Sequence, residues 1–487
     1  MNLAQILEDS AGKFGEKTAL VSENSRYTYQ GLNRAVNALG NYLLGLGLEK
    51  GDKVAIMLPN CPEFVISYFA AVRIGAVAVT LNAMSTSYEL KHILSDSDAR
   101  VLITTMAMVK RFQEIQNDLP LCRHCLLAEG VDHPGSVQAI IAQGPFDLEA
   151  AAVDDRDPAV MIYTSGLTGR PLGAMLTHGN LLSQSWLVRD MIGGTHEDCS
   201  LSVIPLFHSF GAVGNMLAAI RIGAGMVLMD RFTLEGIFAA IERERVTYLA
   251  AVPRLFLGMV LFEGADKYDL SSLRVSITGG AAIPPDYIVQ FQERFRSPLL
   301  EGYGLTEASP VCYFTRLGTP QKLGSIGIPV PGLEGQVVDE EGRELTRGRV
   351  GELVVRGANI MKGYYKDEAA TAEVIKNGWL HTGDLGFMDE DGYVFLTGRK
   401  KRMIITSGFN VYPREVEAVL ELHGMVAAAL AVGKEDLMRG EIVKLLVVRC
   451  PGAEVDEKEI LRHCRAYLSS YKVPREVEFV TELPRGN

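Results

Sequence analysis

A segment rich in glycine, serine and threonine, residues 163–173 (YTSGLTGRPLG), is the most informative part of the sequence for chemistry. It follows a short apolar run that is typical of a strand. Small residues let backbone N–H groups approach a polyphosphate closely, and the hydroxyls of Ser and Thr add hydrogen-bond donors. The segment is not a Walker loop, because the pattern G-x-x-x-x-G-K-[ST] is absent. Taken alone, it predicts either a phosphate-binding loop or an ordinary Ser/Gly turn.

Three further segments carry carboxylates, hydroxyls and glycines in compact patterns. They are residues 301–307 (EGYGLTE), residues 379–384 (WLHTGD), and Gly398-Arg399 followed by residues 404–413 (IITSGFNVYP). Together with the first segment, and in the same order along the chain, they resemble the signature sequences of the adenylate-forming superfamily. That superfamily comprises acyl-CoA synthetases, firefly luciferases and the adenylation domains of peptide synthetases. The overall sequence is most similar to medium- and long-chain fatty acyl-CoA synthetases.

The resemblance implies a nucleotide site built from these segments. Thr306 would contact the α-phosphate, and Glu307 would hold Mg²⁺, which takes one or two carboxylates plus phosphate oxygens. Asp384 would accept hydrogen bonds from both ribose hydroxyls, a role that suits an ionised carboxylate. Tyr303 would stack near the adenine. The residues that the resemblance assigns to ATP or AMP are Thr164, Ser165, Gly166, Thr168, Gly169, Arg170, Gly280, Ala281, Glu301, Tyr303, Gly304, Asp384 and Arg399.

Residues 206–211 (LFHSFG) resemble the stretch that carries an aromatic or histidine gate beside the acyl pocket. His208 would interact with the attacking carboxylate or act as a gate, although a lone histidine is more often structural. Residues 203–213 and 279–282 contain no acidic side chain that could bind the ammonium group of an amino acid, and their small residues favour an apolar channel for an alkyl chain. The residues assigned to this pocket are Phe210, Gly211 and Gly279.

The resemblance also implies a second step in which CoA replaces AMP. Lys401 occupies the position of the hinge about which the small C-terminal domain rotates, and such closures expel water and complete a site. Gly408 would let the pantetheine arm of CoA pass close to the backbone, because a side chain there would fill the tunnel. The residues assigned to the CoA tunnel are Ser407, Gly408 and Phe409.

The sequence departs from the family pattern in three places. Leu167 and Leu172 replace a usual Thr and a usual Lys in the phosphate loop, and Arg170 is a candidate to supply the missing positive charge, because guanidinium groups bind phosphate well. The chain stops at Asn487, where the family continues with a Gly-Lys pair whose Lys contacts the acid during adenylation. We therefore expect weak adenylation by this form and interpret its end as a truncation. Arg402 replaces a common acidic residue, and nothing in the sequence explains this change.

The elements that must position these residues follow from hydrophobic patterning. Short apolar runs alternate with helical patterns in the first 300 residues, which predicts parallel sheets covered by helices on both faces. After about Gly324, glycines and prolines punctuate short strands, which is typical of antiparallel or barrel-like structure. The predicted strands are residues 53–58, 76–81, 100–104, 159–163, 225–229, 248–252, 275–278, 336–339, 351–355 and 392–396.

The predicted fold is α/β, with a large N-terminal domain of two parallel-type β-sheets flanked by helices plus a small β-barrel. A charged turn at residues 398–402 (GRKKR) suggests the domain boundary. We predict an N-terminal AMP-binding domain over residues 1–398 and a small, mobile α+β domain over residues 399–487. The second domain is expected to contain helices at residues 416–422 and 457–468 and strands at residues 427–432 and 442–448.

The composition of the chain argues against several classes of function. The formal net charge of −11 argues against a protein that binds DNA or RNA by neutralising phosphates. Seven scattered cysteines suggest reduced thiols, and the start of the chain reads as neither a signal nor a transit peptide. No run reaches the roughly 18 apolar residues of a membrane span. A cytoplasmic enzyme is therefore expected, and a homodimer is one arrangement that the sequence leaves open.

The resemblance implies a fatty acyl-CoA synthetase that consumes a carboxylic acid, ATP and CoA with Mg²⁺. Thr306, Glu307 and His208 are its predicted catalytic residues. Three alternatives stay open: an aryl-CoA ligase, an acyl-AMP ligase that loads a carrier protein, and a non-catalytic sensor of acyl groups or nucleotides. The ligase that serves a carrier protein is disfavoured because its relatives often carry an insertion in the large domain, and none is evident between Thr306 and Asp384.

Overall fold

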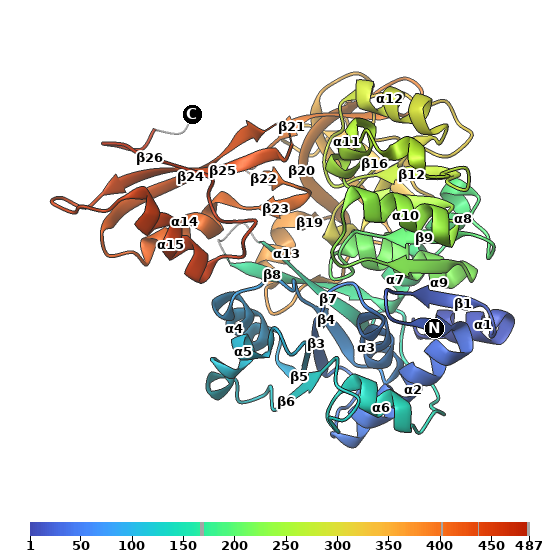
Figure 1. Cartoon of the computed structure of the whole chain (residues 1–487). Coiled ribbons are helices and arrows are strands. Elements are labelled where there is room, and N and C mark those ends of the chain that lie inside the picture. Colours follow the sequence, from blue (N-terminus) through green and yellow to red (C-terminus); the bar gives the residue numbers. More distant parts are fainter. Residues whose placement is uncertain (166–169, 401–402, 437, 485–487) are drawn as a thin grey trace.

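The structure is a computed structural model, and it describes residues 1–165, 170–400, 403–436 and 438–484. Four β-sheets organise these described residues, and Figure 1 shows a large body from which the last part of the chain projects to one side. The first three sheets belong to the large body. The fourth sheet and its two helices form what we call the C-terminal unit, residues 404–436 and 438–484.

The first sheet has seven strands, in the order β18-β8-β7-β4-β3-β5-β6. Its core strands are parallel, whereas β8 is antiparallel to β7 and β18 to β8. Its strands are β3 (Lys53–Met57), β4 (Val77–Thr80), β5 (Ala99–Thr104), β6 (His124–Leu127), β7 (Pro158–Ser165), β8 (Pro171–Thr177) and β18 (Gly363–Tyr364). The helices beside it are α2 (Tyr29–Gly45), α3 (Pro62–Arg73), α4 (Ser87–Asp96), α5 (Val109–Gln113) and α6 (Val137–Gln143), with the 3₁₀ turn η1 (Gln116–Asp118).

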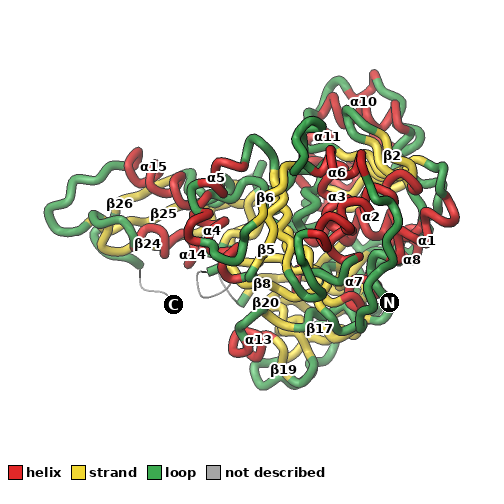
Figure 2. The backbone as a smooth tube through the Cα atoms, turned by 90° about the horizontal axis from the view of Figure 1, so that it is seen from below, coloured by secondary structure: helices red, strands yellow, loops and turns green. Residues whose placement is uncertain are grey.

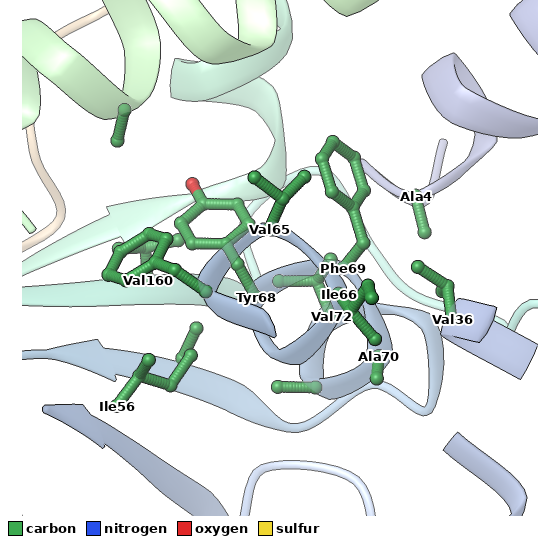
Figure 3. Packing of buried hydrophobic residues seen from close by; sticks show 14 of the residues in the cluster. Ala4, Val36, Ile56, Val65, Ile66, Tyr68, Phe69, Ala70, Val72 and Val160 are labelled. Atoms are coloured by element: carbon green, nitrogen blue, oxygen red, sulfur yellow. The ribbon is translucent and has the colours of Figure 1, made fainter. Parts of the chain in front are cut away.

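Both faces of this sheet are buried, as the uninterrupted apolar runs predict. Along β3, Val54 and Ile56 belong to the cluster under α2 and α3, whereas Ala55 and Met57 belong to the cluster under α4 and α5. The alternation follows from the two-residue period of a strand. Helix α3 is buried on every side, and in Figure 3 the Tyr68 ring lies on the side of Val160 of β7, whereas the Phe69 ring lies on the side of Ala4.

The second sheet has nine strands, in the order β15-β14-β13-β12-β11-β9-β10-β1-β2. The six strands from β13 to β1 are parallel to their neighbours, and antiparallel pairs close both edges. Its strands are β1 (Thr18–Val21), β2 (Arg26–Thr28), β9 (Cys199–Ser202), β10 (Gly225–Leu228), β11 (Tyr248–Ala251), β12 (Val275–Thr278), β13 (Leu299–Gly304), β14 (Val311–Phe314) and β15 (Ile328–Pro329).

Helices cover both faces of the second sheet. One group, α10, α11 and α12, packs on the face that includes Leu201 and Leu249, while α8 and α9 pack on the face that includes Tyr248 and Ala250. The elements around this sheet are α1 (Gln5–Phe14), α7 (His178–Gln184), α8 (Leu187–Ile192), the π-helix η2 (Phe210–Leu217), α9 (Ala218–Ile222), α10 (Leu234–Glu244), α11 (Pro253–Leu261), η3 (Ala265–Lys267), α12 (Pro285–Phe295) and η4 (Thr306–Ala308).

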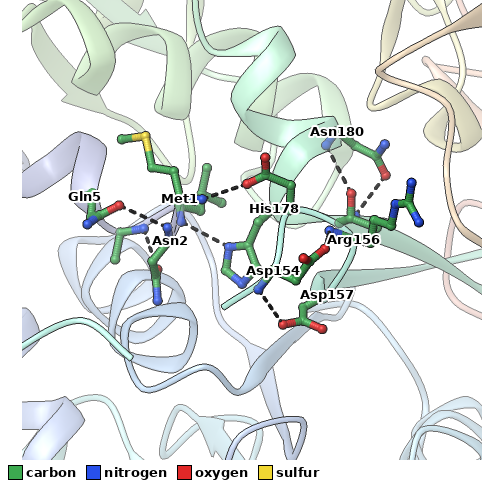
Figure 4. A network of polar contacts seen from close by, with 12 residues as sticks. Met1, Asn2, Gln5, Asp154, Arg156, Asp157, His178 and Asn180 are labelled. Atoms are coloured by element: carbon green, nitrogen blue, oxygen red, sulfur yellow. Dashed lines mark hydrogen bonds and ion pairs between the residues drawn. The ribbon is translucent and has the colours of Figure 1, made fainter. Parts of the chain in front are cut away.

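The start of the chain is fixed to the large body by a polar network, shown in Figure 4. The backbone N–H of Leu3 donates to Nδ1 of His178 at 3.0 Å, and the terminal ammonium of Met1 pairs with Asp155 at 2.7 Å. Burial lowers the pKa of His178 to about 4. The ring is therefore neutral near pH 7, which leaves Nδ1 free to accept the hydrogen bond from Leu3.

A curled antiparallel sheet of five strands stands where the small barrel was predicted. Its strands are β16 (Leu333–Val338), β17 (Gly351–Gly357), β19 (Ile375–Lys376), β20 (Trp379–Met388) and β21 (Val394–Arg399), and α13 (Glu368–Val374) precedes β19. The long strand β20 pairs with β17, β19 and β21. The predicted α/β fold with helix-covered parallel sheets and a small additional domain is thus confirmed.

The C-terminal unit contains the fourth sheet, of order β23-β22-β25-β24 with β26 beside β25. Its elements are β22 (Ile404–Thr406), β23 (Phe409–Val411), α14 (Pro413–Glu421), β24 (Val426–Asp436), β25 (Gly440–Arg449), α15 (Glu457–Tyr467) and β26 (Glu476–Phe479). The proposed boundary near residue 398 falls at the end of β21, the last strand of the curled sheet. No helix in the described ranges is both long and apolar enough to cross a membrane.

Candidate active site

One cavity of about 770 Å³ lies where the nine-stranded sheet, the curled sheet and the C-terminal unit approach one another. Strand β13 and the turn η4 supply part of its wall, and β20, η2, α8 and the β22–β23 hairpin are among the elements that supply further parts. The loops that carry the predicted site residues therefore converge on one space. The predicted residues that line it are Thr164, His208, Phe210, Gly279, Gly280, Ala281, Glu301, Tyr303, Gly304, Thr306, Glu307, Asp384, Arg399 and Gly408.

Asp384 on β20 is the centre of a polar contact on the cavity wall. Its Oδ2 accepts a hydrogen bond from the Tyr303 hydroxyl at 2.5 Å, and its Oδ1 accepts from Nε of Arg399 at 2.7 Å. Burial, and next the neighbouring Asp384, raise the pKa of Tyr303 well above its usual value, so the hydroxyl stays a donor. Antiparallel pairing of β20 with β21 places Asp384 opposite Arg399. Two strands thus hold one carboxylate in a fixed orientation.

Glu307 also lines the cavity, in the turn that follows β13. Its Oε1 accepts from the Tyr364 hydroxyl at 2.8 Å and from Thr164 Oγ1 at 3.4 Å, and its backbone carbonyl accepts from the N–H of Met361 at 2.8 Å. In the described part of the chain, Oε2 makes no hydrogen bond. The carboxylate is thus oriented through one oxygen, while the other is available to a ligand.

The turn that carries Thr306 and Glu307 depends on Gly304. A Cβ at Gly304 would lie 2.0 Å from the carbonyl oxygen of Pro310, so no other residue fits this close approach of β13 and β14. Leu305 then donates its N–H to the same Pro310 oxygen at 2.9 Å. The Thr306 hydroxyl lies 3.3 Å from the hydroxyl of Ser209. The residue pattern GYGLTE therefore encodes a tight turn that presents two polar side chains to the cavity.

Glu301 is a buried carboxyl on the cavity wall. Its side chain has no ionic partner or hydrogen bond among the residues that the structure describes, and only 8% of the residue is exposed. Burial raises the pKa of Glu301 to about 7. The group is thus partly protonated near neutral pH and can act as donor or acceptor toward a ligand.

His208 also faces the cavity, and its ring, like that of His178, is neutral near pH 7. Burial lowers the pKa of His208 to about 4, although the ring keeps partial contact with the cavity. Its Nδ1 accepts the backbone N–H of Phe210 at 3.2 Å. The proton of the neutral ring therefore resides on Nε2, which makes that atom a hydrogen-bond donor.

One part of the cavity wall is apolar. Helix α8 lines it with four apolar side chains, while Arg189 and Asp190 of the same helix pair with each other at 2.7 Å and face away. Gly279 permits the close packing of Phe210, whose ring would lie 3.3 Å from a Cβ there. The lining residues from α8 are Leu187, Val188, Met191 and Ile192.

Gly211 has a packing role. A Cβ at Gly211 would lie 2.3 Å from the carbonyl oxygen of Pro205, so this glycine lets η2 pack on the preceding turn. It does not belong to the cavity lining, unlike its neighbour Phe210 and the next glycine of the same helix, Gly214. Sequence reasoning could not separate the two glycines, because both lie in one small-residue stretch.

The C-terminal unit closes the cavity with its first hairpin. Gly408, at φ +85°, packs against Val252, and a Cβ would lie 2.5 Å from the Val252 Cγ1 atom. Of its two neighbours, Ser407 accepts a hydrogen bond from Arg254 at 3.3 Å, and Phe409 stacks on Tyr471 with ring centroids 4.6 Å apart. Asn410 and Tyr412 also line the cavity, although the sequence analysis did not assign them.

Part of the predicted phosphate loop lies outside the described residues. Gly166, Thr168 and Gly169 fall there, as does the predicted hinge residue Lys401. Of the loop residues that the structure describes, Arg170 is exposed, and Leu172 packs against the large hydrophobic core. The backbones of Ser165 and Pro171 are paired across β7 and β8, so the ends of the loop are fixed by the sheet.

Comparison with known proteins agrees with this geometry. Residues 7–365 match the AMP-binding enzyme family, and residues 415–486 match the C-terminal domain of AMP-binding enzymes. The chain belongs to the AMP-binding enzyme family. As a member of that family it is an adenylate-forming ligase that uses ATP to join an acyl or aryl acid to the thiol of CoA.

Curated relatives align over nearly the whole chain. A long-chain-fatty-acid–CoA ligase of Bacillus subtilis is 34% identical over 99% of this chain and 92% of the relative. A feruloyl-CoA synthase of an Amycolatopsis species is 35% identical over 96% of this chain and 92% of the relative. These two relatives are named for an aliphatic and an aromatic acid, so the family assignment leaves the acid open.

Solved structures give the same picture. The amide bond synthetase of Marinactinospora thermotolerans superposes with a TM-score of 0.91 at 30% identity, covering 99% of this chain and 96% of that one. The o-succinylbenzoate CoA synthetase of Bacillus subtilis, solved with a product analogue, superposes with a TM-score of 0.88 at 28% identity, covering 99% of this chain and 95% of that one. The fold is therefore shared along the whole chain.

Proposed function

We propose that this ligase is an AMP-forming fatty acyl-CoA synthetase. The carboxylate of the acid attacks the α-phosphorus of ATP, the bond to the leaving oxygen breaks, and acyl-AMP and pyrophosphate form. The CoA sulfur then attacks the acyl carbon, and the carbon–oxygen bond to AMP breaks. AMP leaves with the electron pair, and the thiol proton passes to water.

The single observation that carries the proposal is the composition of the cavity wall. Asp384, Tyr303 and Glu307 supply polar groups, whereas α8 supplies only apolar side chains. An alkyl chain gains about 0.8 kcal/mol for each methylene that it buries there. The similarity to long-chain-fatty-acid–CoA ligases of several bacteria supports the same acid class.

Each polar residue has a role in the first step. Asp384, held by Tyr303 and Arg399, is oriented to accept the ribose hydroxyls, and ionised acceptors of this kind form strong hydrogen bonds. Glu301 of β13 is paired with Thr278 of β12, directly before Gly279, Gly280 and Ala281, and we assign this part of the wall to the adenine. His208 offers its Nε2 proton to an acyl carboxylate, which it can orient without adding a charge.

The residues present fit a magnesium ion held jointly with ATP. Glu307 has one carboxylate oxygen fixed by Tyr364 and the other without a hydrogen bond in the described ranges. No cluster of three potential metal ligands occurs in those ranges, and Mg²⁺ is commonly bound by one or two carboxylates together with substrate phosphates. Bound there, the ion would neutralise charge on the phosphates as pyrophosphate leaves.

An aryl-CoA ligase is the second candidate. The relative named feruloyl-CoA synthase is 35% identical, and a solved anthranilate CoA ligase is 30% identical over the whole chain. Phe210 on the cavity wall would suit a flat ring, because aromatic pairs gain energy beyond their buried area.

Mass spectrometry of the products distinguishes these functions. Reactions would contain ATP, Mg²⁺, CoA and one acid from a panel of acetate to palmitate, benzoate and ferulate, with a parallel set that lacks CoA. We expect acyl-CoA and AMP with a maximum among the longer aliphatic acids. A maximum with benzoate or ferulate would replace the proposal by the aryl function. Acyl-AMP without acyl-CoA would indicate a ligase for a carrier protein, and no product would favour a sensor.

A further inference from the structure

A buried group of three ionisable side chains joins the C-terminal unit to the large body. Nζ of Lys472 donates to Oε1 of Glu89 at 2.7 Å and also to Oε1 of Glu415. Each of the three side chains is only 7% exposed. In the described part of the chain, Glu89–Lys472 is the only ion pair that connects the C-terminal unit with the preceding sheets. We call Glu89, Lys472 and Glu415 the ionic lock.

Hydrogen bonds around the ionic lock connect the same two parts of the molecule, the C-terminal unit and α4 of the large body. Ser469 donates to Oε2 of Glu89 at 2.5 Å, and Thr86, which caps α4, donates to the Tyr467 carbonyl at 2.9 Å. Figure 2 shows α14 beside α4 where the C-terminal unit meets the large body. Burial alone would raise the pKa of Glu89, but Lys472 and these hydrogen bonds lower it, so Glu89 is ionised. The ion pair between Glu89 and Lys472 is therefore buried away from water.

The lock is connected directly to the cavity wall. Glu415 donates its backbone N–H to the carbonyl of Tyr412 at 3.0 Å, and Tyr412 lines the cavity. Tyr471, the neighbour of Lys472 in the chain, stacks on Phe409 of β23. Both ends of strand β23 are thus supported by residues of the lock or their immediate neighbours.

The other contacts of α4 reach the strands that flank the phosphate loop. His92 lies 3.1 Å from the carbonyl oxygen of Pro171 on β8, and Asp96 accepts from the Tyr163 hydroxyl on β7 at 2.6 Å. Glu89, His92 and Asp96 are spaced by three and four residues, which places them on one face of the helix. Helix α4 therefore connects the C-terminal unit to β7 and β8, the strands that flank the phosphate loop.

We propose that the ionic lock positions the β22–β23 hairpin in the cavity wall for attack by the CoA thiol. The proposal rests on the proposed function, because it assigns positioning residues to its second step. The first step uses polar groups of the large body, Asp384, Glu307 and Arg399, which the lock does not touch. Removing one partner of a buried ion pair leaves the others uncompensated, so the C-terminal unit would leave α4.

Separate assays of the two steps test the lock. Lys472→Met keeps the length of the side chain but removes its charge. With preformed dodecanoyl-AMP and CoA, we expect acyl-CoA formation to fall about tenfold and the KM for CoA to rise. ATP-dependent pyrophosphate release without CoA should stay within about twofold of the unmodified chain. Equal losses in both assays, or no loss in either, would overturn the proposal.

A matched control and a rescue separate positioning from general stability. Lys434→Met breaks the exposed Lys434–Glu476 pair within the C-terminal unit and should leave both assays unchanged. The double exchange of Glu89→Lys with Lys472→Glu restores a pair of opposite charges across the interface, and we expect it to recover most of the CoA-dependent rate. Failure of the rescue, while the melting temperature is retained, would count against the lock.

Hydrogen exchange provides a measurement that needs no turnover. The amides of residues 404–411 should exchange faster in Lys472→Met than in the unmodified chain, and Lys434→Met should not change them. An unchanged exchange rate in Lys472→Met would overturn the lock. Lack of acyl-CoA with the unmodified chain, combined with faster exchange in the variant, would instead overturn the proposed function and leave the lock as a docking contact.

Discussion

The polar and the apolar parts of the cavity wall are built on different principles. In the polar part, Asp384 has its partners at 2.5 and 2.7 Å, and each partner comes from a different strand. In the apolar part, α8 contributes side chains such as Val188 and Met191 that make no directional contacts. Hydrogen bonds to charged groups fail abruptly when one atom is removed, whereas apolar contacts change gradually with buried area. We therefore expect sharp losses from changes in the polar part and graded shifts from changes in the apolar part.

The largest effect is expected for Asp384→Ala. The change removes an ionised acceptor and leaves Tyr303 and Arg399 without their partner. The two charge-assisted hydrogen bonds that Asp384 would accept from the ribose hydroxyls contribute about 3–6 kcal/mol. The rate of acyl-AMP formation should therefore fall about 10³-fold. Pyrophosphate release measures this rate. Asp391→Ala, which removes an exposed carboxylate paired with Lys322, is the control, and a loss at Asp384 no larger than in this control would refute the assignment.

Glu307→Gln should have the next largest effect. The amide keeps an acceptor for the Tyr364 hydroxyl but loses the charge that a magnesium ion requires. We expect the rate of acyl-AMP formation to fall about 10²-fold and the Mg²⁺ concentration for half-maximal rate to rise. A magnesium titration of both forms checks this. Unchanged magnesium dependence would assign Glu307 to the turn rather than to the metal.

Val188→Phe tests the apolar part of the wall. The larger ring would displace two or three methylenes of a bound chain, each worth about 0.8 kcal/mol, so kcat/KM for the longest accepted acids should fall by a factor of about 15 to 60. Shorter acids should be nearly unaffected, which moves the optimum of the acid panel to a shorter chain. Val289→Phe, on the exposed face of α12, adds the same ring away from the cavity. The same loss for all chain lengths would contradict a graded effect of the apolar part.

The smallest effect concerns Glu301, whose pKa is raised to about 7. Between about pH 4.5 and 7, this carboxyl therefore binds more protons in the folded state than in the unfolded state. Its contribution to the free energy of unfolding is thus present at low pH and is lost as the pH rises through 7. Because the carboxyl faces the cavity, its desolvation is incomplete, which limits the effect to about 1 kcal/mol. In the absence of nucleotide, Glu301→Gln should therefore stabilise the chain more at pH 8 than at pH 5.

Denaturant unfolding at the two pH values measures this difference. His178 has the opposite dependence, because its pKa is lowered to about 4 and its neutral form is favoured by folding, so its contribution is lost as pH falls below 6.5. The comparison must therefore be made between the variant and the unmodified chain at each pH. An equal effect of Glu301→Gln at pH 5 and pH 8 would show that the carboxyl does not titrate in this range.

Much of the scaffold was predictable from local patterns. The run at residues 53–58 corresponds to β3, and the helix predicted at residues 416–422 corresponds to α14, with differences of up to three residues at the ends. The strand expected at 392–396 instead begins at Val394 as β21, because the preceding glycine forms the turn from β20. Periodicity identifies an element well, whereas its ends depend on turn geometry and capping.

The polar part of the site was also accessible from sequence, because its residues lie in short segments whose spacing is fixed by tight turns. Gly304 illustrates this, since the close approach of Pro310 admits no side chain. The apolar part was not accessible in the same way. Gly211 and Gly214 look equivalent in the sequence, yet only Gly214 lines the cavity, because the turn of η2 directs Gly211 toward Pro205.

The sequence by itself determined the family, the reaction class and the groups that can do chemistry, because spacing within a turn or a strand is local information. Only the tertiary structure decided which distant residues meet. Glu89 and Lys472 are separated by 383 positions, and their pairing depends on how the C-terminal unit docks on α4. The raised pKa of Glu301 likewise depends on burial by elements far along the chain. Electrostatic energies depend on distance and on exclusion of water, which no local pattern specifies.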